Sequence, residues 1–125
     1  LPVTTNRDII SAFLQKDSKS PKIIFTTYMS GPILSEVAKK VNCAIDFCIF
    51  DEAHKTTGRA NKKSATLLDE NNINIKKRLF MTATERILSG SGKSEKAYSM
   101  NDKSAYGECF HTLTFKEVIN EGIIF

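Results

Sequence analysis

The stretch "AIDFCIFDE", residues 44–52, carries the strongest indication of the fold. A short run of mostly apolar residues without regular polar alternation is typical of a strand whose two faces are both covered. Two similar runs lie before and after it, "KIIFTTY" at 22–28 and "KRLFMTAT" at 77–84. Helical patterns alternate with these runs, so the sequence predicts an α/β fold with a mostly parallel sheet and helices on its faces.

Two helices are predicted in the first third of the chain. Apolar residues four apart indicate a helix over about 7–16, with Asn6 as its cap. A second helix over about 32–41 begins at Pro32, a residue that suits the first turn because it has no N–H to satisfy there. Each helix has one apolar side, which is the side expected to pack on the sheet.

The second half of the chain gives weaker signals. A helix is predicted where Thr114 and Glu117 form a capping box and Gly122 provides the stop. Residues 87–105 are rich in Ser, Gly and Lys, which indicates a long surface loop. The remaining expectations are a loop over 54–64, a short helix over 64–70, and strands over 106–113 and 123–125.

Length and composition restrict the class of protein. The chain has 125 residues, 41% of them hydrophobic, and a net charge of +4, as expected for one globular domain. No apolar run approaches the roughly 18 residues of a membrane helix, and the start has no secretory pattern. We therefore expect a cytoplasmic protein without membrane association. Because the first residue is Leu, we also expect a piece of a longer protein. The three cysteines are interpreted as buried, reduced thiols: Cys43, Cys48 and Cys109.

Polar side chains follow each predicted strand directly. In open parallel sheets, ligands bind beyond the carboxyl ends of the strands, so these residues are expected at the edge of one site. They stand at the ends of the three quoted runs, after the apolar part of each: Thr26, Thr27 and Tyr28 in the first, Asp51 and Glu52 in the second, and Thr82 and Thr84 in the third.

Asp51 and Glu52 have the residue types that phosphoryl transfer needs. A carboxylate can hold Mg²⁺, which keeps several waters and needs only one or two protein carboxylates. A second carboxylate beside it could orient and deprotonate an attacking water. Two adjacent acids after a strand could equally be a solvated turn, so the pair alone leaves both interpretations open.

A larger pattern surrounds this pair. The segment "FCIFDEAHKTTG", followed about thirty residues later by "RLFMTATER", resembles motifs II and III of superfamily 2 DEAD/DEAH-box helicases and translocases. The subgroup it resembles most is the bacterial and viral "DEAH-[RK]-T-T-G" ATPases, including motor domains of some restriction enzymes. The segments "TTYMS", "SMND" and "YGECFHTLTFKEVINEGI" also match that subgroup. The resemblance implies that residues 1–125 are a partial helicase ATP-binding domain, the first RecA-like motor lobe of a P-loop NTPase.

The resemblance also implies roles for single residues, with ATP and Mg²⁺ as cofactors. Asp51 would be the Walker B acid that holds Mg²⁺ through water, and Glu52 would be the catalytic base. His54, Thr82 and Thr84 would couple hydrolysis to movement. The resemblance places three residues near a nucleic acid: Thr26, Thr27 and Tyr28. Hydroxyls suit this position because they can bond phosphate without reading sequence. We expect the nucleic acid to be DNA in preference to RNA.

Simpler interpretations stay open for several of these residues. His54 could be a hydrogen-bonded structural residue, Thr82 a strand terminus, and Tyr28 a packing residue. A metal-dependent hydrolase unrelated to helicases could be built on Asp51, Glu52 and His54.

One required motif is missing from the chain. A Walker A loop, G-x-x-x-x-G-K-[ST], supplies backbone N–H groups and a lysine to the phosphates. "SGSGKSEK", residues 89–96, matches only its end, because Ile87 stands where the first glycine is needed. The Walker A segment and the second RecA-like lobe are therefore expected outside this chain, which alone should have little or no ATPase activity. The alternative is a truncated, non-catalytic module that binds nucleic acid or a protein.

Overall fold

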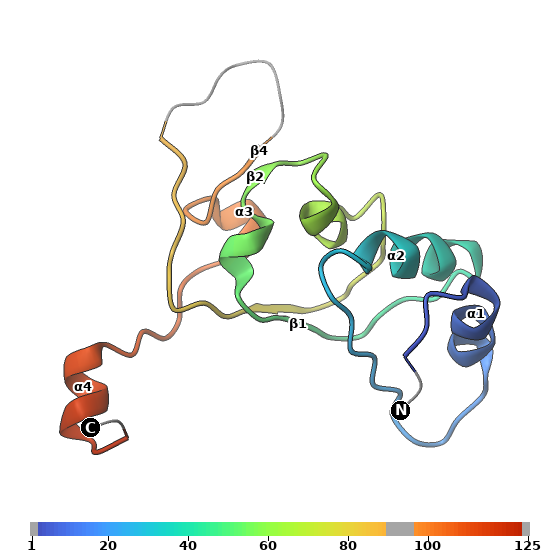
Figure 1. Cartoon of the computed structure of the whole chain (residues 1–125), viewed down its shortest axis with the longest axis horizontal. Coiled ribbons are helices and arrows are strands. Elements are labelled where there is room, and N and C mark those ends of the chain that lie inside the picture. The colour runs from blue at the N-terminus through green and yellow to red at the C-terminus, as the bar shows by residue number, and fades with distance from the viewer. Residues whose placement is uncertain (1–2, 90–96, 124–125) are drawn as a thin grey trace.

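The computed structural model of the chain describes residues 3–89 and 97–123 (Figure 1). Helix α1 spans Arg7–Gln15, and the side chain of Asn6 caps it, as predicted, by accepting hydrogen bonds from Asp8 N and Ile9 N. Helix α2 spans Gly31–Lys40 and carries Pro32 in its first turn. Both predicted helices are confirmed, with boundaries shifted by one residue.

Two of the three apolar runs form the expected parallel pair. Strand β1 (Cys48–Phe50) and strand β3 (Arg78–Phe80) lie side by side, with Phe50 opposite Phe80. An isolated parallel bridge between Ile45 and Ile75 extends the pairing toward the start of both runs. The strands are shorter than the runs that predicted them, but their direction is the one that the sequence indicates.

Short elements occupy much of the two predicted loops. After β1 come a 3₁₀ helix η1 (Ala53–Thr56) and strand β2 (Gly58–Arg59), which pairs antiparallel with β4 (Ala97–Tyr98). The predicted short helix is a 3₁₀ helix, η2 (Lys63–Leu68), and helix α3 (Lys103–Tyr106) lies in the second loop. The loop prediction is therefore wrong at β2, β4 and α3. Most of "SGSGKSEK" lies outside the described residues, and so do residues 124–125 of the last predicted strand.

Helix α4 (Phe115–Asn120) has both of its predicted ends. The Thr114 hydroxyl accepts from the Glu117 N–H while the Glu117 carboxylate accepts from the Thr114 N–H at 2.7 Å, which is the capping box. Gly122, with φ of 67°, closes the helix through bonds from Gly122 N to Ile119 O and from Ile123 N to Val118 O, both 3.0 Å. None of the helices in the described part of the chain is both long and apolar enough to cross a membrane.

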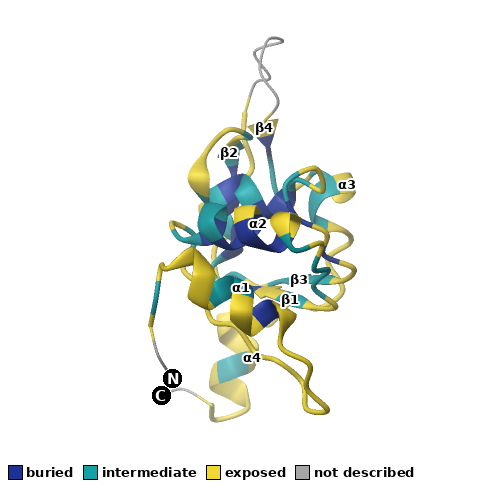
Figure 2. Ribbon diagram, turned by 90° about the vertical axis from the view of Figure 1, so that its right-hand side faces the viewer, coloured by how far each residue is buried: buried dark blue, intermediate teal, exposed yellow. Residues whose placement is uncertain are grey.

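The core lies on one side of the parallel pair. In Figure 1, α2, η1 and η2 all lie on the same side of β1, and α2 makes its main contacts with η2 and α1. Figure 2 shows buried residues concentrated on α2 and the elements around it. Helix α4 lies apart from these elements in Figure 1 and contains no buried residue. The buried apolar side chains are Leu14, Leu34, Val37, Ala38, Phe50, Ala53, Ala65, Leu67, Leu68, Ile73, Ile75 and Tyr98.

The prediction of helices on both faces is wrong for the described chain. Phe47 and Ile49 of the β1 region are exposed by about half, because no described element covers their side of the pair. The chain has 9719 Å² of accessible surface, whereas a compact monomer of 14.0 kDa has about 6,700 Å². Large apolar areas thus remain available for contact with other structure.

Two predicted strands do not form. Residues 22–28 and 106–113 contain no strand. Apart from Tyr28 and Tyr106, their apolar residues are exposed, for example Phe25 at 84% and Phe110 at 81%. Within the described chain, no backbone hydrogen bond connects residues 22–26 to another segment. Strand formation requires a partner, and these two segments have none there.

The three cysteines are free thiols, but they are not equally buried. Cys43 and Cys48 are half-buried, and burial raises the pKa of the Cys48 thiol. Cys109 is exposed, because the segment around it is not the covered strand that was predicted. The prediction of three buried thiols is therefore wrong for Cys109.

Candidate functional site at the ends of the parallel strands

The polar residues that follow β1 and β3 meet at one edge of the pair. Met81 N donates to Phe50 O and Ala53 N donates to Met81 O, both at 2.9 Å, so the two chains stay in contact beyond the last paired residues. This ladder places Asp51 and Glu52 beside the segment that begins at Thr82. The sequence predicted this juxtaposition from strand ends alone, and the parallel direction of β1 and β3 produces it.

Glu52 has an unusual backbone conformation. Its φ of 52° and ψ of 47° lie in the left-handed region, which only glycine adopts without steric cost. For a glutamate the conformation costs on the order of 1–2 kcal/mol, so the surroundings must hold it. The result is a sharp turn directly after β1, from which the Glu52 side chain reaches His54.

His54 is the centre of a small polar cluster with Glu52, Thr82 and Thr84. His54 Nδ1 lies 2.9 Å from Thr82 Oγ1, 3.2 Å from Thr84 Oγ1 and 3.2 Å from Glu52 Oε2. These four residues are called the His54 cluster below. They come from η1, the turn before it and the segment after β3, so the fold brings together all three predicted coupling residues and the predicted base.

The hydrogen bonds of the Thr82 hydroxyl indicate which ring nitrogen of His54 carries the hydrogen. The Thr82 hydroxyl donates its one hydrogen to Thr84 O at 3.1 Å and also accepts from Thr84 N at 3.2 Å. It must therefore act as an acceptor toward His54 Nδ1, as the Glu52 carboxylate does. Nδ1 is then the N–H donor, and Nε2 is left as the acceptor in the neutral imidazole.

Asp51 points its functional group away from the core. The residue is exposed, and one carboxylate oxygen, Oδ1, accepts from Glu52 N at 3.0 Å. The other oxygen has no hydrogen-bond partner among the described residues, so it is available to a ligand. A single carboxylate of this kind suits a Mg²⁺ ion that keeps several waters. The described residues contain no group of three or more His, Cys, Asp or Glu that could hold a metal by themselves, so the unrelated metal hydrolase has no ligand cluster there.

The first predicted group divides into two environments. Tyr28 is half-buried; its ring lies against Phe50 with centroids 6.5 Å apart, and its hydroxyl donates to Asp51 O at 2.6 Å. Burial, with a contribution from the Asp51 charge, raises the pKa of Tyr28 to about 12. Thr26 and Thr27 are exposed, and the Thr27 hydroxyl interacts with Ser30 before α2. These two threonines do not join the His54 cluster.

Two residues near the site received no role from the sequence. Thr56 is completely buried, and its hydroxyl donates to Ala53 O at 2.7 Å and lies 2.8 Å from the hydroxyl of Tyr106. Because the single hydroxyl hydrogen of Thr56 goes to Ala53, Tyr106 is the donor in the second bond. In the sequence, Thr56 was noted only as part of "TTG" and Tyr106 only as part of "YG". Neither segment indicated that these residues, 50 positions apart, would meet.

A row of aromatic rings in contact lies next to the turn that follows β1. Tyr28 stacks on Phe50, Phe50 on Phe80 with centroids 4.8 Å apart, and Phe80 meets the edge of Tyr106 at 4.9 Å. Such pairs add to the burial of apolar area. The row crosses both strands, and each tyrosine at its end donates a hydrogen bond to the chain between Asp51 and Thr56.

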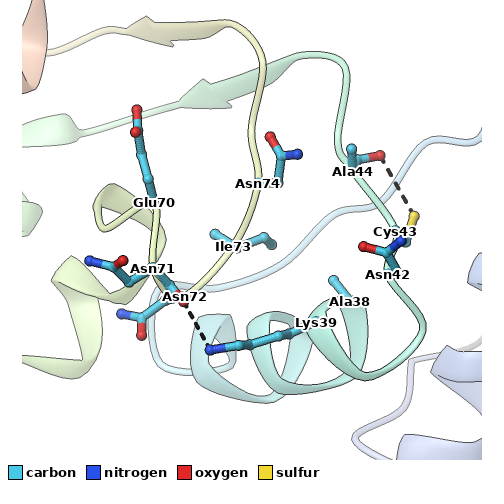
Figure 3. A pocket seen from close by; sticks show the side chains of 10 residues that line it. All are labelled: Ala38, Lys39, Asn42, Cys43, Ala44, Glu70, Asn71, Asn72, Ile73 and Asn74. Atoms are coloured by element: carbon cyan, nitrogen blue, oxygen red, sulfur yellow. Dashed lines mark hydrogen bonds between the residues drawn. The ribbon is translucent and has the colours of Figure 1, made fainter.

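Two pockets of the described chain lie away from the His54 cluster. Figure 3 shows one of about 360 Å³ at the opposite, amino-terminal ends of the strands, lined by residues 38–39, 42–44 and 70–74, with Lys39 bonded to the Asn71 carbonyl at 3.1 Å. A second, mostly apolar pocket of about 400 Å³ lies between α1, α2 and the extended residues 23–27. The candidate site is instead an open edge, as expected for half of an interface.

Comparison with known proteins gives one informative match. No protein-family model matches the sequence, and no significant match is found among curated proteins. A solved structure of a nuclease-deletion mutant of the Type ISP restriction-modification enzyme LlaGI, in complex with a DNA substrate mimic, is similar with a TM-score of 0.73 and 32% sequence identity. The match covers 98% of this chain and 10% of that one. This chain is therefore similar, over almost its entire length, to about one tenth of a restriction-modification enzyme.

Proposed function

We propose that the chain is part of the ATP-binding motor lobe of a nucleic-acid-dependent ATPase, a helicase or translocase, within a partial RecA-like domain. One observation carries the proposal: the acidic pair after β1 and the threonines after β3 meet around His54. The similarity to part of a restriction-modification enzyme supports it, because that match includes both strands and their ends.

The residues would divide the chemistry between them. Asp51 would hold Mg²⁺ through water, and the ion would neutralise charge on the phosphates of ATP. Glu52 would orient and deprotonate the attacking water. Because His54 contacts both Glu52 and the threonines, any movement of residues 82–84 would change the surroundings of the base. This is the coupling role proposed for His54, Thr82 and Thr84.

The missing half of the site would attach to surfaces that are open in this chain. Within the described residues β3 pairs only with β1, so its other edge is free to accept another strand. One side of the pair is uncovered, and the total surface exceeds that of a compact monomer. We propose that the Walker A segment and the second lobe lie outside this chain and cover these surfaces.

The nucleic acid would lie near the exposed hydroxyls of Thr26 and Thr27. They lie before the first turn of α2, where hydroxyl and N–H groups suit phosphate oxygens. DNA is favoured over RNA because the LlaGI structure contains a DNA substrate mimic. Tyr28 adjoins these threonines, so its ring also stays a proposed contact.

The test uses a longer protein in which a Walker A segment precedes this chain. We expect ATP hydrolysis that DNA stimulates, and we expect Glu52→Gln to abolish turnover while ATP binding is retained. Glu121→Gln, a change of the same kind at an exposed position beyond α4, is the control and should leave turnover intact. Undiminished turnover in Glu52→Gln would remove the base from this proposal.

A second candidate is a non-catalytic module that binds nucleic acid. The net charge of +4 and the exposed threonines favour it, because neither feature needs a phosphate loop. Titration of this chain with labelled single- and double-stranded DNA at several salt concentrations tests it. Phosphate contacts predict affinity that falls steeply as salt rises. Absence of binding at low salt would reject this candidate.

A further inference from the structure

We infer that Tyr28 is a positioning residue for Glu52. Its hydroxyl holds the peptide group that precedes Glu52 and so maintains the left-handed turn that directs the carboxylate to His54. The inference rests on the proposed role of Glu52 as the base and adds a residue to that role. It also gives Tyr28 a function within the chain, separate from contact with nucleic acid.

The conformation of Glu52 is determined by the two peptide groups on either side of it. Rotation about φ and ψ of Glu52 turns these two groups relative to each other, so holding both fixes both angles. All four of their polar atoms are bonded: Asp51 O to Tyr28, Glu52 N to Asp51 Oδ1, Glu52 O to Lys55 N, and Ala53 N to Met81 O. The left-handed turn is therefore held by identifiable bonds.

Only two of these four bonds come from distant parts of the chain. The bond to Met81 O is made by backbone, while the bond to Asp51 O is made by the Tyr28 side chain at 2.6 Å. Among the residues that the structure describes, Tyr28 is thus the one distant side chain that holds the peptides around Glu52. Stacking on Phe50 fixes its ring, and a phenol hydroxyl carries the hydrogen that the bond to Asp51 O requires.

Tyr106 provides a matched comparison at the other end of the aromatic row. It is also half-buried, its ring meets Phe80, and it donates to Thr56 at the far end of η1. Its bond does not involve a peptide next to Glu52. Loss of the Tyr106 hydroxyl should therefore weaken the fold without any specific dependence on residue 52.

The experiment is a double-mutant cycle in this chain, with thermal unfolding as the measurement. Tyr28→Phe removes only the hydroxyl, and Glu52→Gly allows the left-handed turn without steric cost. We expect Tyr28→Phe to lower Tm when residue 52 is glutamate, and to lower it by no more than half as much when residue 52 is glycine. Tyr106→Phe should lower Tm equally in both backgrounds. No loss with Tyr28→Phe, or the same loss in both backgrounds, would overturn the inference.

A second measurement reports on Glu52 directly. In NMR spectra of the chain, Tyr28→Phe should move the Cα and Cβ shifts of Glu52 away from left-handed values and change the imidazole nitrogen shifts of His54, while Tyr106→Phe leaves both in place. Unchanged shifts in Tyr28→Phe would contradict the inference even if Tm falls. Neither measurement needs ATP hydrolysis, so a failure of the proposed ATPase would be recognised separately in the longer protein.

Discussion

Residues 22–28 and residues 44–50 have similar apolar sequences but opposite environments. The second segment pairs with a parallel neighbour, buries Phe50 to 2% exposure and ends at the candidate site. In the first segment, no backbone hydrogen bond connects residues 22–26 to another part of the described chain, and Phe25 is exposed at 84%. Composition predicts the tendency to form a strand, whereas the strand itself forms only where a second chain segment supplies hydrogen bonds and cover.

The largest expected difference between these segments concerns their phenylalanines. Phe50→Ala removes a buried ring that stacks on two neighbours, and should lower the free energy of unfolding by about 3–5 kcal/mol. Phe25→Ala, the same change in the unpaired segment, should alter it by less than about 0.5 kcal/mol. Urea unfolding of both variants measures the difference. Equal losses would mean that residues 22–28 are packed in solution.

Threonines extend the comparison to polar side chains. Thr56→Val leaves Ala53 O and the Tyr106 hydroxyl without their buried partner, which should cost about 1–3 kcal/mol of unfolding free energy. Thr26→Val is the control, because within residues 3–89 and 97–123 the exposed Thr26 hydroxyl bonds only to the adjacent Thr27 O. We expect a change within about 0.5 kcal/mol. The same urea titration measures both. A neutral Thr56→Val would show that the bond to Tyr106 does not contribute.

The smallest expected effect is a pH dependence of the N-terminal cap of α4 that α2 does not share. The pKa of Glu117 is lower than its ordinary value because its carboxylate accepts hydrogen bonds from Thr114. The bond from the Thr114 hydroxyl has the larger effect and the bond from its N–H the smaller. The capping contribution is therefore complete above the pKa of the unfolded chain, near 4.5, and is lost as pH falls through the lower folded value. Amide shifts of the first turn of α4 should move toward unfolded values over this range.

The first turn of α2 provides the internal control for that titration. It contains no acidic residue and has Pro32 as its second residue, so its amides should not follow the same curve. A parallel change in both helices would indicate general acid unfolding instead of the loss of one cap. Thr114→Ala should remove the pH dependence at α4, because no cap remains to be titrated.

Local signals in the sequence predicted local structure well. Asn6, Pro32 and the pair of Thr114 with Glu117 each mark a helix that the structure contains, because a cap acts within one turn of the chain. The meeting of the β1 and β3 ends was also predictable, since parallel strands place their carboxyl ends at one edge. Thr56 and Tyr106 could not be paired in advance, because 50 residues separate them and no short pattern records the distance.

The sequence by itself determined where α1, α2 and α4 lie, the parallel direction of the β1 and β3 runs, and the residue types at their ends. It did so because capping, periodicity and strand composition depend on neighbours a few positions away. Only the tertiary structure decided which apolar runs become strands, which side of the pair is covered, and that Glu52 adopts a left-handed turn held in part by Tyr28. Those outcomes depend on hydrogen-bond partners and cover supplied by residues far away in the chain.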